Sequence, residues 1–126
     1  MLALKMQYDV SYNCSNILKG QEVFIVDDIQ QIIMQIIVYS GDARTKAMEA
    51  IKNAKKGKIQ EARELLIASD EEFSKAHCFQ TDLIQKEAAG EDIGISLLMI
   101  HAQDHLMNAM TIKGIAKEFV DLYENK

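Results

Sequence analysis

Proline is absent from this sequence of 126 residues, cysteine occurs only twice, and no apolar run is long. Because proline breaks helices, its absence favours long uninterrupted helices. Two cysteines, Cys14 and Cys78, are too few for a disulfide framework, and this usage fits a reducing compartment. No apolar run reaches the roughly 18–20 residues that cross a bilayer, and the N-terminus lacks a basic segment followed by an apolar stretch. We therefore expect a cytoplasmic protein with no direct membrane insertion.

Positive charge is scarce as well. Lysine and arginine number 14 against 19 aspartates and glutamates, which gives a formal net charge of −5, and no basic block occurs. We therefore expect no nucleic-acid partner. Apolar residues make up 48% of the chain, enough for one domain with a real core, and the chain is too short for two.

Helical periodicity is the main pattern that the sequence does contain. Apolar residues recur at i, i+3 and i+4 over about residues 28–56, 58–89 and 91–123, with Gly57 and Gly90 after the first two segments. Short connections of this kind make consecutive helices antiparallel neighbours. The sequence thus predicts an all-α fold, an antiparallel up-down-up three-helix bundle.

Two parts of the chain depart from this simple pattern, the residues before the first helix and a short stretch inside the second. Residues 1–27 have no helical period, so we interpret them as a loosely attached N-terminal arm, with the bundle domain over residues 28–126. Residues 69–72 (SDEE) resemble a capping box that would begin a new helix. Because no glycine or proline breaks the chain there and the apolar spacing continues, we expect one continuous helix.

The third predicted helix has two apolar stripes. The first consists of Ile95, Leu98, Ala102, Leu106 and Met110. The second consists of Leu97, Ile112, Ile115 and Phe119. One stripe should face its own bundle and the other needs a partner chain, so we expect a closed homo-oligomer with the third helices near its axis.

A polar pentapeptide, His101-Ala102-Gln103-Asp104-His105, interrupts this apolar helix. Residues three and four apart share a helix face, so His101, Asp104 and His105 form one polar stripe. Two imidazoles and a carboxylate between apolar surfaces are costly unless they are paired or used. We therefore take the stripe as the candidate functional site.

Four interpretations of the stripe are open on spacing alone. One is a buried polar network in which the carboxylate orients an imidazole. A second is a metal-dependent hydrolase in which His101 and His105 bind zinc, with Glu118 or Asp121 as a speculative third ligand. A third is a histidine nucleophile whose neighbour fixes its tautomer. The fourth is an oligomer axis where symmetry-related Asp104 carboxylates meet and need a cation or protons.

His77 and Cys78 are adjacent in the second predicted helix. Adjacent helical residues point about 100° apart, so they do not form a nucleophile and base pair. We expect Cys78 to be a small packing residue and His77 a satisfied core histidine, although His77 could still lie opposite the third helix and join the polar cluster.

Three stretches of the chain resemble a known family. They are residues 40–44 (SGDAR), residues 76–90 (AHCFQTDLIQKEAAG) and residues 97–107 (LLMIHAQDHLM). Together they closely resemble the lactose/cellobiose-type enzyme IIA of the bacterial sugar phosphotransferase system, over about residues 28–125. Residues 1–27 fall outside the resemblance.

The resemblance implies a homotrimer of three-helix bundles, nine helices in all, that carries a phosphoryl group. His101 aligns with the histidine that accepts the group from HPr and passes it to a cysteine of the cognate enzyme IIB, which serves the membrane enzyme IIC. Asp104 aligns with the carboxylate that meets its symmetry mates at the trimer axis, where one structural divalent cation, such as Mg²⁺, would suit the oxygen ligands. A β-linked disaccharide of the cellobiose, lactose or chitobiose type is the implied sugar.

Physical chemistry adds roles for the neighbouring side chains. An imidazole in an apolar crevice between subunits stays neutral and nucleophilic, and Gln103 and His105 are candidate hydrogen-bond donors to the phosphoryl oxygens. The absence of arginine and lysine from the pentapeptide suits a carrier that must release the group. A metal-dependent hydrolase using His101 and His105, or a non-catalytic helical interaction module, are the alternatives.

Overall fold

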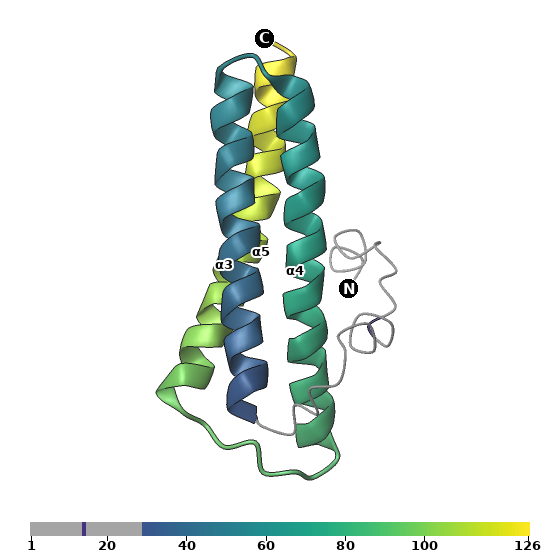
Figure 1. Cartoon of the computed structure of the whole chain (residues 1–126), viewed down its shortest axis with the longest axis vertical. Helices are drawn as coiled ribbons and strands as arrows, with labels where there is room; N and C mark the ends of the chain where they lie inside the picture. Colours follow the sequence, from purple (N-terminus) through teal and green to yellow (C-terminus); the bar gives the residue numbers. More distant parts are fainter. Residues whose placement is uncertain (1–13, 15–28) are drawn as a thin grey trace.

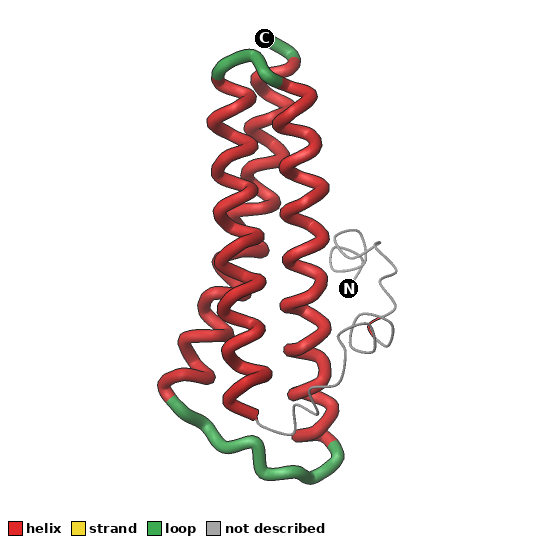
Figure 2. Tube along the Cα trace, viewed as in Figure 1, coloured by secondary structure: helices red, strands yellow, loops and turns green. Residues whose placement is uncertain are grey.

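The computed structural model describes Cys14 and residues 29–126, and residues 29–126 consist of three α-helices and their connections. They are α3 (Ile29–Lys55), α4 (Ile59–Ala88) and α5 (Leu97–Glu124). The helices α3 and α4 run antiparallel side by side, and α5 lies behind them and swings away from α4 toward its N-terminal end (Figure 1). Figure 2 shows that the chain between and after these helices, from residue 56 onward, is loop. The all-α, up-down-up bundle that the sequence predicts is confirmed.

The buried face of α3 is built largely from small residues. Its buried side chains are Ile32, Ile33, Ile36, Ser40, Ala43, Ala47, Ala50 and Ala54. All eight follow the i, i+3 and i+4 spacing of the first predicted helix, and the four alanines let the neighbouring helices approach closely. The larger isoleucines fill the half of the core near the start of α3, where Phe73 and Phe79 of α4 and Leu106 of α5 also pack.

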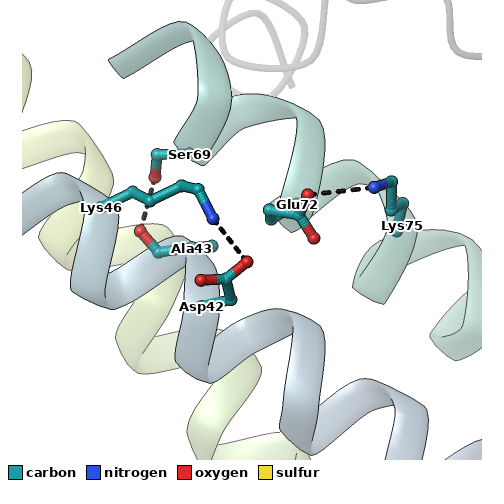
Figure 3. Close-up of polar contacts among 6 residues, drawn as sticks. All are labelled: Asp42, Ala43, Lys46, Ser69, Glu72 and Lys75. Carbon is teal, nitrogen blue, oxygen red and sulfur yellow. Dashed lines mark hydrogen bonds and ion pairs between the residues drawn. The ribbon is translucent and has the colours of Figure 1, made fainter. Parts of the chain in front are cut away.

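The helix α4 is continuous through residues 69–72, as predicted. The Ser69 hydroxyl does not cap a new helix but donates a hydrogen bond to the main-chain oxygen of Ala43 on α3, at 2.7 Å (Figure 3). Figure 3 also shows two ion pairs within single helices beside this contact, Lys46 with Asp42 and Lys75 with Glu72. The buried hydroxyl therefore ties α4 to α3 instead of starting a helix.

The third helix begins later than the sequence predicts. Residues 91–96 form a loop, and α5 begins at Leu97, because local contacts favour a turn before it. The Asp92 carboxylate accepts a hydrogen bond from the amide of Gly94, whose φ of 69° suits glycine. The Ser96 hydroxyl then caps the helix by accepting from the Met99 amide, at 3.1 Å. Ile95, predicted to line the inner stripe, is 90% exposed in this loop.

The two cysteines are bonded to each other, and here the sequence-based prediction is wrong. Cys14 and Cys78 form a disulfide across a sequence separation of 64 residues. The sulfur of Cys78 lies in the bundle, where the side chain is buried as expected of a packing residue. Apart from Cys14, the predicted N-terminal arm of residues 1–27 lies outside the described residues, as does Asp28 at the predicted domain boundary.

None of the three described helices combines the length with the apolar character that a bilayer-spanning segment needs.

Candidate functional site on the outer face of helix α5

The two histidines of the pentapeptide touch each other on the second and third turns of α5. The Nε2 atoms of His101 and His105 are 3.1 Å apart, and the rings meet edge to face with their centroids 4.5 Å apart. This contact follows from the spacing, because residues four apart lie one above the other on a helix. Between two facing ring nitrogens only one hydrogen fits, so one imidazole donates and the other accepts.

The site is more exposed than the sequence analysis expects. His101 is exposed, and His105 is half-buried, because this side of α5 faces away from α3 and α4. The apolar crevice expected around the imidazole is therefore not formed by the single chain. A second chain is needed to bury it.

Asp104 lies on the same outward side, between exposed apolar residues. Ile100 is 55% exposed and Met107 is 41% exposed. In the described part of the chain no hydrogen bond or ion pair engages the Asp104 carboxylate. The expected orientation of an imidazole by this carboxylate is thus not present, since His101 pairs with His105 instead.

Gln103 points the other way, toward α4. Its Oε1 accepts a hydrogen bond from Nε2 of Gln80 at 2.6 Å, and its own Nε2 lies 3.9 Å from the sulfur of Met99. The structure therefore does not bring Gln103 to the histidines of its own chain. The sequence patterns do not predict this contact, although Gln80 falls within the apolar spacing of the second predicted helix, and a glutamine there is itself a signal of a polar partner.

His77 lies on α4 in the half-buried position expected of a core histidine. Its ring stacks on that of Phe73, with centroids 6.2 Å apart. Desolvation by burial lowers the pKa of His77 below its ordinary value of 6.5. The imidazole is therefore held in its neutral form more strongly than an exposed histidine.

Metal ligands do not gather within one chain. Over Cys14 and residues 29–126, no group of three or more histidine, cysteine, aspartate or glutamate side chains is arranged to hold a metal ion. The zinc-hydrolase interpretation needs a third ligand beside His101 and His105, and the described residues do not supply one. A cation at Asp104 needs ligands from other chains.

An open cleft separates α4 from α5 beyond the histidines. Its volume is about 810 Å³, and Ile67 of α4 and Ile115 of α5 line it. Both are large apolar side chains in contact with solvent, 60% and 46% exposed. With Leu97 and Phe119, which are 83% and 40% exposed, they make α5 and the adjacent edge of α4 an apolar surface. The predicted second stripe of α5 is therefore exposed at these positions, while Ala102 and Leu106 of the first stripe are buried.

These observations define a class of protein, a helical bundle with two paired imidazoles on an exposed helix face. The family model described as "PTS system, Lactose/Cellobiose specific IIA subunit" matches residues 31–124, and the chain belongs to this family. A curated relative, the lichenan-specific phosphotransferase enzyme IIA component of Bacillus subtilis (strain 168), is 56% identical over 98 residues, which cover 78% of this chain and 89% of the relative.

Solved structures agree with this assignment. The crystal structure of the PTS cellobiose-specific enzyme IIA from Bacillus anthracis superposes with a TM-score of 0.76 at 55% identity, covering 77% of this chain and 89% of that one. The IIA(chitobiose) chain in solution structures of its complex with HPr, from Escherichia coli, gives a TM-score of 0.68 at 34% identity, covering 79% of this chain and 96% of that one.

Proposed function

We propose that this chain carries a phosphoryl group on His101 between phospho-HPr and a cysteine of the cognate enzyme IIB. The observation that carries the proposal is the exposed His101 imidazole held by His105 through facing Nε2 atoms at 3.1 Å, in a chain of the enzyme IIA family. The protein would act in the cytoplasm, where both partners meet it.

Each of the two transfers requires one bond to form and one bond to break. When HPr docks, the His105 N–H turns from the Nε2 lone pair of His101 to a phosphoryl oxygen. The freed lone pair then attacks phosphorus, while Nδ1 of His101 carries the ring proton. The new P–N bond forms as the P–N bond to the histidine of HPr breaks. In the second half, a thiolate of enzyme IIB attacks, the P–S bond forms, and His101 regains its free Nε2. The phosphoryl group is conserved throughout, and no water takes part.

Stabilisation of the group should be moderate. A loose phosphoryl-transfer transition state needs positioning and charge complementarity. The Nε2–H of His105 would donate to a phosphoryl oxygen on His101, and Gln103 of a neighbouring chain would be the second donor. The pentapeptide has no arginine or lysine, so the group is held by neutral donors and can leave again.

A homotrimer would complete the site. The exposed apolar surface of α5 and the α4–α5 cleft both need covering, and a threefold axis beside Asp104 would bury them together. Three Asp104 carboxylates at such an axis supply hard oxygen ligands, the donors that Mg²⁺ prefers. This cation would offset their mutual repulsion and would have a structural role.

The sugar follows from the relatives. Their names include lichenan-specific, cellobiose-specific and lactose-specific components, so a β-linked disaccharide is the proposed class. Selection of the sugar itself would rest with the membrane enzyme IIC that enzyme IIB serves.

Incubation with phosphoenolpyruvate, enzyme I and HPr tests the proposal. One acid-labile, base-stable phosphoryl group per chain should appear, and it should be lost in His101→Ala. His77→Gln is the matched control and should be labelled like the wild type. Labelling that survives His101→Ala contradicts the proposal, and a folded chain that HPr never labels favours a non-catalytic interaction module.

A further inference from the structure

Gln80 of α4 bonds by its side chain to the pentapeptide. It donates from Nε2 to Oε1 of Gln103 across the two helices, at 2.6 Å, and both side chains are half-buried. Nothing in the chemistry above assigns a role to this residue. Its hydrogen-bond partner Gln103, however, is the second proposed donor to the phosphoryl oxygens.

This hydrogen bond sets which end of the Gln103 amide meets Gln80. The amide oxygen is turned inward to Gln80, and Nε2 contacts the Met99 sulfur, a weak acceptor, at 3.9 Å. If both amides were reversed, the Gln103 oxygen would face that sulfur, which has no hydrogen to donate. The amide orientation in the structure therefore makes one more interaction than the reversed one. It also leaves the second N–H of Gln103 available to donate to another group.

We propose that Gln80 is a positioning residue for phosphoryl transfer, which it serves by holding Gln103 with its N–H group outward to meet a phosphoryl oxygen. This inference rests on the function proposed above. An N–H at this point stabilises the negative phosphoryl oxygens, whereas a carbonyl oxygen would repel them. The orientation of the Gln103 amide thus decides whether this residue stabilises or repels the phosphoryl group.

The phosphoryl group that Gln103 meets belongs to a neighbouring chain. Residues two apart lie about 200° apart around a helix, so the Gln103 amide does not reach His101 of its own chain. With Asp104 directed at a threefold axis, the two histidines lie on one side of α5 and Gln103 lies on the other. Each site then combines the imidazoles of one protomer with the Gln80 and Gln103 pair of the next.

The substitution Gln80→Glu tests this role in the full chain. A carboxylate only accepts, so the Gln103 amide must turn its N–H inward and its oxygen outward. The rate constant for transfer from phospho-HPr should fall about tenfold or more, the value of a hydrogen bond to a charged group, with KM for HPr unchanged. The control Gln85→Glu adds the same charge at an exposed position of α4 and should leave both constants unchanged.

A double-variant cycle separates positioning from direct repulsion by the new charge. In a Gln103→Leu background the amide is gone, so Gln80→Glu should have no further effect on the rate constant. An equal loss in both backgrounds overturns the proposal. Gln80→Met frees the Gln103 amide without adding charge, so it should lower the rate constant less than Gln80→Glu does. It replaces Gln80→Glu as the test if the charged variant does not fold.

The outcomes also distinguish the two proposals. A wild-type chain that phospho-HPr does not label refutes the carrier function itself. A wild-type chain that is labelled, together with Gln80→Glu reacting as fast as Gln85→Glu, refutes only the role of Gln80.

Discussion

The hydroxyl of Ser69 on α4 donates a hydrogen bond to the main-chain oxygen of Ala43 on α3 at 2.7 Å, with the serine side chain fully buried. A second serine, Ser40, is equally buried on α3, yet its Oγ has no hydrogen-bond partner among the described residues. The two serines are therefore equally buried, but only the Ser69 hydroxyl has a hydrogen-bond partner among the described residues.

Alanine substitutions at these serines should have different effects on stability. Ser69→Ala loses the hydrogen bond between the helices and should lower the free energy of unfolding by about 1 kcal/mol. Ser40→Ala removes a buried hydroxyl that has no partner, so it should leave the free energy unchanged or raise it by up to about 1 kcal/mol. Urea titrations followed by circular dichroism measure both, and a loss at Ser40 as large as at Ser69 would show that its hydroxyl is bonded in solution.

Reduction of the Cys14–Cys78 disulfide should destabilise the fold. The closed loop spans a sequence separation of 64 residues, and the chain-entropy relation gives about 4 kcal/mol for a loop of this length. Urea titrations with and without dithiothreitol should show the difference in the wild type. Cys14→Ser should show no effect of the reductant, and a wild type that is equally insensitive would mean that the pair is not bonded in solution.

The lowered pKa of His77 predicts a pH dependence of stability. Above pH 6.5, its ordinary pKa, the imidazole is neutral in both the folded and the unfolded chain. As the pH falls through this value the unfolded chain binds a proton first, so the free energy of unfolding falls until the folded chain is protonated too. His77→Gln should have a shallower loss of stability below pH 6.5 than the wild type, and identical slopes would contradict the shift.

Replacement of Asp104 by leucine tests the proposed axis. Three apolar groups would replace three repelling carboxylates, so Asp104→Leu should keep or strengthen the trimer and abolish binding of the divalent cation. Sizing by light scattering and metal analysis measure the two effects. Glu87→Leu, an exposed carboxylate on α4, is the control and should retain the cation; dissociation of Asp104→Leu into monomers would place Asp104 away from an axis.

Mixed trimers test whether a site is shared between protomers. Chains with Gln103→Leu should accept the phosphoryl group about tenfold more slowly, and chains with His101→Ala should not accept it at all. When the two variants are unfolded and refolded together, some sites pair an intact His101 with an intact Gln103 of its neighbour. A fast phase should then return, and its absence after confirmed exchange would place both residues of a site in one chain.

The sequence predicted most of the bundle because its signals are periodic and local. The eight buried positions of α3 all follow the predicted spacing, and α4 runs unbroken through its internal capping box. The start of α5 was missed, because the turn at Gly94 and the Ser96 cap outweigh the acidic residues at 91 and 92 as a helix start. Ile84 follows the apolar spacing of the second predicted helix but is 59% exposed, since the apolar face of α4 is wider than the surface that α3 and α5 cover.

For the site, the sequence alone placed the two imidazoles together, because a spacing of four residues on a helix with 3.6 residues per turn aligns them whatever lies around them. The family resemblance to enzyme IIA, carried by the same stretch, is confirmed by the family match. The partners of residues on different helices depended on the tertiary structure. Gln103 faces Gln80 and Ser69 reaches Ala43 because the packing of the whole core sets the rotation and offset of each helix, and no local pattern encodes these two quantities. The bond of Cys14 to Cys78 likewise joins residues too far apart in the sequence for a local pattern to predict.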